Sequence, residues 1–255
     1  MTSGDLQAFK ARFRGPLLRP GDPGYEESRK VWNGMIDRKP ALVAKPTGAA
    51  DVVECVNFAR GRRLLLSIKG GGHNVAGTAI AEGGLTIDMS GMKGVFVDPV
   101  ARTVRVQPGC TLGDVDRETQ LYGLATALGF VSETGIAGLT LGGGFGYLTR
   151  RFGWTVDNLL EVEIVTADGR VLRANDREHE DLFWAIRGGG GNFGVVTAFT
   201  YRLHPVGPRI VGGMIAWPAA RAAEVLDLYR KMTVSAPREL TLVLTIRFAP
   251  SAPFV

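Results

Sequence analysis

The chain has few of the side chains that bind metals or form cross-links. Its 255 residues include two cysteines, Cys55 and Cys110, and three histidines, His73, His179 and His204. The cysteines have neither the spacing of a zinc site nor the number that a disulfide framework needs, so we expect two reduced, buried thiols. The histidines lie in separate segments without metal-ligand spacing, so we expect no metal site.

Long apolar runs are also missing. No run reaches the roughly 20 residues that a membrane-spanning helix needs. The opening residues, MTSGDLQAFKARF, lack the apolar core of a secretory signal. The net charge of +5 arises partly from short basic spots such as Arg150–Arg151, without interleaved aromatic residues, which disfavours a nucleic-acid groove. We therefore expect a cytoplasmic protein with neither a membrane nor a nucleic-acid partner.

Glycine, in contrast, is abundant. The 35 glycines are about twice the share expected of an average chain. They cluster at positions 70–72, 142–146 and 188–194, whereas a flexible linker would spread them out. Glycine lets the backbone bend tightly and approach a ligand closely. The clusters therefore indicate fixed turns or a surface for a phosphate-bearing ligand.

Residue periodicity predicts a chain that mixes helices and strands. Helices are expected over 45–61, where Gly61 would end the helix, over 111–123, with Thr111 as N-cap, and over 177–187. Short β-rich runs predict strands at 64–69, 85–90, 94–99 and 103–109, a hairpin over 160–175 about Asp168–Gly169, and a strand at 195–206. We expect the first four strands to form one small mixed sheet.

Proline and glycine signals divide the chain into three parts. Residues 1–37 are expected to form a mostly irregular N-terminal arm, and residues 38–207 the first domain. Beyond it, the pattern predicts a strand over 209–218, a helix over 219–232 and a strand over 239–248. Three such elements rarely form a stable domain alone. We therefore expect residues 208–255 to be the start of a second domain in a truncated chain.

The third glycine cluster contains the spacing G-x-G-x-x-G at Gly189, Gly191 and Gly194. In a Rossmann unit this motif follows a strand and opens a helix. Here a predicted helix comes before it and a predicted strand after it, which argues against a nicotinamide-binding Rossmann site. A Walker P-loop is disfavoured because no G-K-[ST] follows any glycine run.

The first cluster, KGGGHNVAG, directly follows the strand predicted for 64–69 and places His73 inside a glycine turn. Such a turn can direct successive backbone N–H groups at one anion. Three roles are open to His73: a turn histidine bonded to its own backbone, a general base that titrates near neutral pH, or a nucleophile. The residues alone leave the choice open.

Four stretches together resemble the FAD-linked oxidases of the vanillyl-alcohol oxidase/p-cresol methylhydroxylase (PCMH) superfamily. They are KGGGHNVAG, RVQPGCTLGDV, the segment 133–171 from ETGIAGLTLGGGFGYL to TADGRV, and DLFWAIRGGGGNFGVVTAFTYRLHPV. Within the superfamily the chain is similar to the berberine bridge enzyme-like branch, which includes 6-hydroxynicotine oxidases. The resemblance implies an α+β fold: a PCMH-type FAD-binding domain of two α+β subdomains, followed by the start of an α+β substrate domain.

The resemblance also implies a set of cofactor-binding residues. It implies that His73 is covalently bonded to the 8α carbon of FAD. The remaining cofactor contacts that it implies are Lys69, Gly70, Gly71, Gly72, Asn74, Val75, Ala76 and Gly77 in the first loop, Thr134, Gly135, Gly138, Leu139, Gly142, Gly143, Gly144 and Gly146 in the second, and Gly194 and Val195 in the third.

Many relatives add a second, cysteine tether to the flavin. Aligning GIAGLTLGGG puts Val131 at that position, and Cys110 lies too early in the chain and in another motif. We therefore predict a single attachment, through His73, and a buried thiol at Cys110. A nitrogen substituent at the 8α carbon withdraws electrons from the ring, which makes the flavin a stronger oxidant.

By this resemblance the protein is expected to be an FAD-dependent oxidase. A hydride would pass from a small alcohol, amine or sugar-like substrate to flavin N5, and O2 would be the electron acceptor. In relatives the catalytic base comes from the covering domain, so we name none. Two alternatives stay open: a catalytically silent FAD-binding fragment, and a protein that binds a non-flavin nucleotide through its glycine loops.

Overall fold

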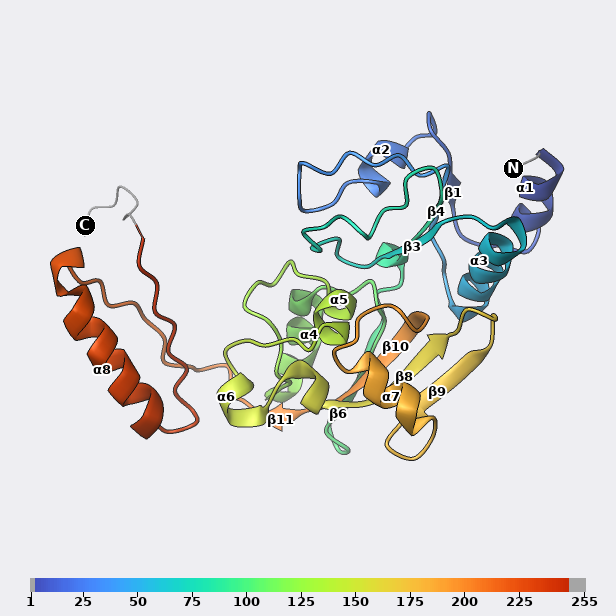
Figure 1. Cartoon of the computed structure of the whole chain (residues 1–255). Coiled ribbons are helices and arrows are strands. Elements are labelled where there is room, and N and C mark those ends of the chain that lie inside the picture. Colours follow the sequence, from blue (N-terminus) through green and yellow to red (C-terminus); the bar gives the residue numbers. More distant parts are fainter. Residues whose placement is uncertain (1–2, 248–255) are drawn as a thin grey trace. The chain divides into compact units, whose positions relative to one another are not determined.

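The computed structural model describes residues 3–247, which fall into two compact units (Figure 1). One unit ends at Gly207, and the other begins at Pro208. The larger unit contains a four-stranded sheet, a five-stranded sheet and a two-stranded sheet, with helices packed against them. The predicted α+β fold class is confirmed.

The first sheet lies in the N-terminal part of the larger unit. Its spatial order is β1 (Leu17–Leu18), β2 (Leu42–Ala44), β4 (Leu85–Asp88) and β3 (Leu66–Lys69). β2, β4 and β3 run parallel to one another. Parallel strands need a crossover connection, and the helix α3 (Ala49–Arg62) provides one between β2 and β3, which lie on the two sides of β4. α3 packs on the sheet through a stripe of buried residues, which are Val52, Cys55, Val56 and Ala59.

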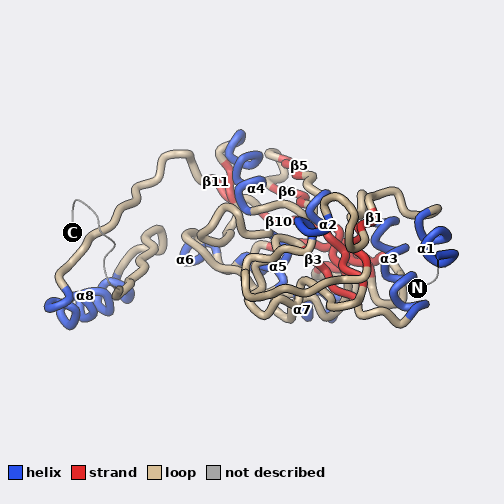
Figure 2. The backbone as a smooth tube through the Cα atoms, turned by 90° about the horizontal axis from the view of Figure 1, so that it is seen from above, coloured by secondary structure: helices blue, strands red, loops and turns tan. Residues whose placement is uncertain are grey.

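The second sheet is antiparallel throughout. Its order is β5 (Val95–Asp98), β6 (Thr103–Val106), β10 (Val195–Arg202), β8 (Leu159–Val165) and β9 (Val171–Asn175). α3 also reaches this sheet, because Val165 and Val195 belong to the same core cluster as the buried face of α3. In Figure 2, α3 lies beside the strands of the larger unit, at the end that carries α1 (Ser3–Lys10).

The prediction that the first four strand runs form one mixed sheet is wrong. β3 and β4 pair in the first sheet, whereas β5 and β6 form a hairpin in the second, where β6 pairs with β10. An alternating pattern identifies a strand, but its partner is chosen by packing with residues distant in sequence. The hairpin predicted for 160–175 is confirmed as β8 and β9.

The helix predicted for 111–123 is confirmed as α4 (Leu112–Thr119), followed by a 3-10 turn at Gln120–Tyr122. The Thr111 hydroxyl accepts a hydrogen bond from the backbone N–H of Asp114, and the Asp114 carboxylate accepts one from the N–H of Thr111. This reciprocal capping box satisfies two backbone donors that the first helical turn would leave unpaired. Gly123 ends the segment with φ 63°, in the left-handed region that favours glycine.

The structure also contains short elements that the sequence analysis did not predict. Within residues 1–37 these are α1, β1 and α2 (Tyr25–Ser28). Between residues 124 and 157 they are β7 (Leu124–Ala125), α5 (Ile136–Leu141), α6 (Thr149–Phe152) and a 3-10 turn at Thr155–Asp157. β7 pairs with β11 (His204–Pro205). Another 3-10 turn, Met89–Gly91, follows β4. Most of these elements are too short to show a periodic pattern.

Two helix predictions near these elements can be compared directly. The helix expected at 177–187 is confirmed as α7 (Glu180–Ile186). α3 was expected to end at Gly61, but it continues to Arg62, and Arg63 takes the left-handed conformation instead. The N–H of Arg63 then caps the carbonyls of the last turn.

In the second unit, the helix predicted for 219–232 is confirmed as a 3-10 turn at Ala219–Arg221 and α8 (Ala222–Ser235). The two predicted strands are wrong as far as the structure describes them. Residues 209–217 and 240–247 form no strand, and Phe248 lies outside the described residues. A strand needs a hydrogen-bonded neighbour. Among the described residues, nothing pairs with either segment.

Within residues 3–247, none of the helices is both long enough and apolar enough to span a lipid bilayer.

A buried hydrogen bond connects α5 to the second sheet. The hydroxyl groups of Thr140 on α5 and Tyr201 on β10 lie 2.7 Å apart, and both side chains are buried. Burial raises the pKa of Tyr201, so its phenol stays protonated. A buried hydroxyl costs free energy when it has no partner. This bond therefore holds α5 in a defined position on the sheet.

We predict that Thr140→Val lowers the free energy of unfolding by ~1–3 kcal/mol, because it leaves the Tyr201 hydroxyl buried without a partner. Urea unfolding followed by circular dichroism measures the change. The double variant Thr140→Val/Tyr201→Phe removes both hydroxyls and is expected to recover part of the loss. If Thr140→Val were as stable as the parent protein, the bond would not stabilise α5.

Candidate functional site

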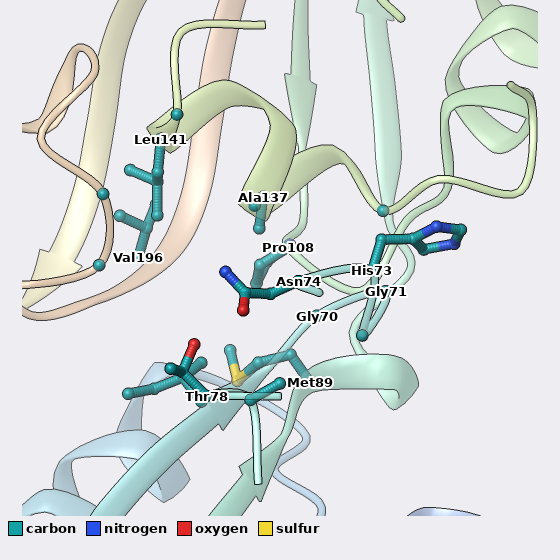
Figure 3. Close-up of a pocket in the computed structure, with 18 of the residues that line it drawn as sticks. Gly70, Gly71, His73, Asn74, Thr78, Met89, Pro108, Ala137, Leu141 and Val196 are labelled. Atoms are coloured by element: carbon teal, nitrogen blue, oxygen red, sulfur yellow. The ribbon is translucent and has the colours of Figure 1, made fainter. Parts of the chain in front are cut away.

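A cavity of about 650 Å³ in the larger unit is bordered by three glycine-containing loops (Figure 3). One loop follows β3, the second leads into α5, and the third precedes β10. The volume lies within the range of roughly 300–1,000 Å³ that is usual for ligand and cofactor sites. The cavity is the strongest candidate for a binding site in the described residues.

The first loop depends on close contact between two backbones. A Cβ atom at Gly71 would lie 2.5 Å from the backbone nitrogen of Gly135, in the second loop. A Cβ at Gly135 would collide in turn with the nitrogen of Gly71. Only glycine at both positions lets the loops approach this closely. Gly72 and Gly77 have φ of 71° and 70°, which lets the loop turn sharply on both sides of His73.

The N-terminal arm engages the carbonyl groups of this loop. The N–H of Trp32 donates to the Gly72 carbonyl over 3.0 Å. The side-chain amide of Asn33 donates to the Val75 carbonyl, and Arg38 donates to the Gly77 carbonyl, each over 2.8 Å.

The N–H groups of the loop, in contrast to its carbonyls, have no such partners among the described residues. Within residues 3–247, the backbone N–H groups of residues 71–75 have no acceptor in the chain. A turn of this kind can therefore present successive N–H donors to an anion.

His73 and Asn74 take different places in the cavity. The Asn74 amide points into the middle of it, whereas the imidazole of His73 lies at the edge and points away from Asn74 (Figure 3). His73 is half-buried and is the one titratable side chain among the lining residues that the structure describes. The same lining contains no carboxylate that would repel an anionic ligand.

The second loop contributes part of what the sequence implied. Thr134, Gly135, Gly138, Leu139 and Gly142 line the cavity. Three further glycines of the predicted set lie outside the lining, and these are Gly143, Gly144 and Gly146. They permit tight packing instead, because a Cβ would contact the Trp154 ring at Gly143, the Thr155 hydroxyl at Gly144 and the Leu128 carbonyl at Gly146.

The third loop lies between α7 and β10, in the helix-to-strand order that the sequence predicted. Gly194 and Val195 both line the cavity. Gly194 has φ of 148°, and a Cβ there would lie 2.5 Å from the carbonyl oxygen of Val165 on β8. Glycine at this position therefore lets the loop lie against the second sheet.

Four predicted residues of the first loop lie outside the lining, namely Lys69, Val75, Ala76 and Gly77. The Lys69 ammonium group donates to the Ser28 carbonyl over 2.7 Å. Burial lowers the pKa of Lys69, an effect partly opposed by the negative charge of Asp88. The charged end of Lys69 therefore holds the last residue of α2 against the loop.

Several lining residues were not among those that the sequence analysis assigned to the site. Met89, Thr78 and Ala79 follow or precede β4, Leu141 lies on α5, and Val196 lies on β10. The neighbours of Met89, Thr78 and Ala79 along the chain show nothing that distinguishes a cavity residue from a core residue. Pro108 also lines the cavity and belongs to the RVQPGC motif. Pro108, Leu141 and Val196 all lie in the stretches that carry the family resemblance, so the motifs were the available signal for these three residues.

Both cysteines are free and buried, as predicted. Burial raises the pKa of the Cys110 thiol to about 11 and raises that of Cys55 as well. Neither cysteine lines the cavity. Within the described residues, no group of three or more histidine, cysteine or acidic side chains is placed to hold a metal ion.

Comparisons with known proteins agree with this site. The family described as FAD binding domain matches residues 40–175. An FAD-linked oxidoreductase of Dictyostelium discoideum is 39% identical over 244 residues, which cover 94% of this chain and 53% of the relative. The chain thus spans about half the length of this relative, and similar or smaller shares of the other curated relatives that it matches.

Solved structures share the fold. The crystal structure of 6-hydroxy-D-nicotine oxidase from Arthrobacter nicotinovorans has a TM-score of 0.83 and 34% identity, over 86% of this chain and 50% of that one. The carbohydrate oxidase from Microdochium nivale has a TM-score of 0.75 and 30% identity, over 79% of this chain and 43% of that one.

The resemblance to FAD-linked oxidases of the berberine bridge enzyme-like branch is confirmed. The matched region contains the first two of the three cavity loops. Because this match also spans more than half of the sequence, the chain belongs to the family of FAD binding domains.

Proposed function

We propose that this chain is the FAD-binding part of an oxidoreductase and that His73 bonds covalently to the flavin. The observation that carries the proposal is the loop after β3. It combines a run of backbone N–H groups that have no acceptor within residues 3–247 with an imidazole at the edge of the cavity. No other described loop of the cavity offers both an anion site and a nucleophile.

The residues present fit FAD. Its pyrophosphate is anionic and would be held by the N–H groups of residues 71–75, with the Asn74 amide as a further donor. The described part of the lining has no carboxylate, so no negative charge there would oppose the phosphates. Apolar side chains such as Leu139, Leu141 and Met89 suit the flat rings of the cofactor. These features support FAD over a non-flavin nucleotide, and the family match favours it too.

His73 would supply the covalent link. A neutral imidazole has a lone pair on one ring nitrogen, which is the nucleophile that a bond to the 8α carbon requires. Cys110 is buried outside the cavity with a raised pKa, which supports a single attachment. When bound, the flavin would accept a hydride at N5 from a small alcohol, amine or sugar-like substrate, and O2 would reoxidise it.

One observation favours a second candidate function, a catalytically silent FAD-binding chain. Substrate oxidation needs a group that accepts the substrate's proton. Among the residues that the structure describes, the cavity lining offers no titratable side chain besides His73, which the proposal commits to the flavin. The chain by itself is therefore expected to hold FAD without fast turnover. Anaerobic bleaching of the flavin by alcohols, amines and sugars would distinguish the two candidates.

We predict that His73→Ala binds FAD reversibly, because the variant keeps the N–H groups of the loop but lacks the nucleophile. After acid precipitation, the flavin of the parent protein should stay with the pellet, and that of His73→Ala should appear in the supernatant. The control is His179→Asn, which changes a histidine outside the cavity and suits its left-handed backbone, φ 51°. Acid-stable flavin in His73→Ala would show that another residue is the anchor.

We predict that Gly71→Ala reduces the flavin content of the purified protein at least about tenfold. The new methyl group would meet the Gly135 backbone at 2.5 Å and push apart the two loops that border the cavity. Overpacking of this kind costs about 1–3 kcal/mol. Gly61→Ala is the control, because a Cβ there meets nothing within 4 Å. Flavin absorbance per mole of protein is the measurement, and a normal content in Gly71→Ala would contradict the proposed site.

A further inference from the structure

The indole of Trp32 stacks on the imidazole of His73. The ring centroids lie 4.9 Å apart, and the ring planes meet at 16°. This is an offset stack of the kind that aromatic side chains favour. Trp32 belongs to the N-terminal arm, which the sequence predicted to be irregular and to which it assigned no role at the site.

Backbone contacts on both sides of His73 hold the two rings together. The N–H of Trp32 donates to the carbonyl of Gly72, immediately before the histidine, and the Asn33 amide donates to the carbonyl of Val75, two residues after it. The Val31 side chain also lies against Gly72. These contacts hold the backbone of the arm beside the backbone of the loop, so the two rings are kept close by more than the rotamer of Trp32.

The imidazole has few other constraints. Three glycines precede His73, and they provide no side chains to confine the ring. Within the described residues, neither ring nitrogen of His73 has a hydrogen-bond partner, and the stack on Trp32 is the contact of the ring. A hydrogen bond would orient the ring but would also occupy a nitrogen. A stacked neighbour orients the ring through its face and leaves both nitrogens accessible at the edge.

We infer that Trp32 is a positioning residue that orients the His73 imidazole for bond formation with the flavin. The inference rests on the covalent attachment proposed above. Trp32 takes no part in the reaction, and its effect is to limit the orientations that the nucleophile samples. A reacting group held in the right orientation reacts faster than one that turns freely.

The attachment itself is an oxidation that needs an electron acceptor. A nitrogen–carbon bond forms between the imidazole and the 8α carbon. One hydrogen leaves the imidazole nitrogen, and one leaves the 8α methyl group. The two electrons and two protons are taken up by dioxygen, which becomes hydrogen peroxide. Stacking on Trp32 changes the rate of this step and leaves its products unchanged.

Trp32 is suited to a test by substitution because its side chain contributes little to the core. It is 70% exposed. Trp32→Ala removes the stack, and Trp32→Phe keeps an aromatic face for the imidazole. Trp184 on α7 is 79% exposed and lies outside the cavity lining, so Trp184→Ala is the matched control.

The experiment separates attachment from binding. Each variant is purified from riboflavin-limited cells and incubated with FAD in air, and the adduct is followed by intact mass spectrometry while total bound flavin is measured by absorbance. We expect attachment in Trp32→Ala to slow about fivefold to tenfold, as the loss of one aromatic pair implies. Total bound flavin should stay unchanged. Trp32→Phe should recover most of the rate, and Trp184→Ala should match the parent protein.

Two outcomes would overturn the role of Trp32 and leave the proposed function intact. One is an unchanged attachment rate in Trp32→Ala, and the other is a fall in total bound flavin as large as the fall in attachment. In both, the parent protein still forms the adduct, so the proposed function stands. A parent protein that binds FAD but never forms an adduct would instead refute the covalent bond, and the role of Trp32 with it.

Discussion

The contact between the backbones of Gly71 and Gly135 is the constraint on which the candidate site depends. Gly71 belongs to the loop after β3, in the first sheet, and Gly135 leads into α5, which is bonded to the second sheet through Thr140 and Tyr201. Hydrogen bonds from Leu112 to the Thr134 carbonyl and from Ile136 to the Cys110 carbonyl hold the second loop against the start of α4. With a side chain at either glycine, the two loops could not border one cavity.

The chemistry of the site comes from the backbone more than from side chains. The arm satisfies the carbonyls of Gly72, Val75 and Gly77, whereas the N–H groups of residues 71–75 have no acceptor within residues 3–247. Lys69, the cation nearest along the chain, is bonded to the Ser28 carbonyl. An anion site built this way needs glycine and a supporting strand rather than a positive patch. The proposed anion site therefore agrees with a sequence that has clustered glycines and no strong basic cluster.

The arm and the second unit show how context changes the meaning of a local pattern. The prolines of residues 1–37 correctly indicate little regular structure, yet this segment supports the loop that carries His73. Residues 240–247 alternate as a strand should, yet without a partner they form none. The arm is irregular but makes defined contacts with the loop, whereas residues 240–247 have a regular pattern but no strand to pair with among the described residues.

Signals that act within a few residues could be predicted from the sequence. These include the capping box of Thr111 and Asp114, the hairpin at Asp168–Gly169, and the glycine turn with its histidine, because caps and turns depend on adjacent residues. Together with the motif spacing, they also identified the family. Tertiary structure alone decided which strands share a sheet, why Gly142 lines the cavity while Gly144 packs against Thr155, and that Trp32 lies on His73. Those outcomes depend on contacts between residues far apart in the chain, and no local pattern of residues encodes such contacts.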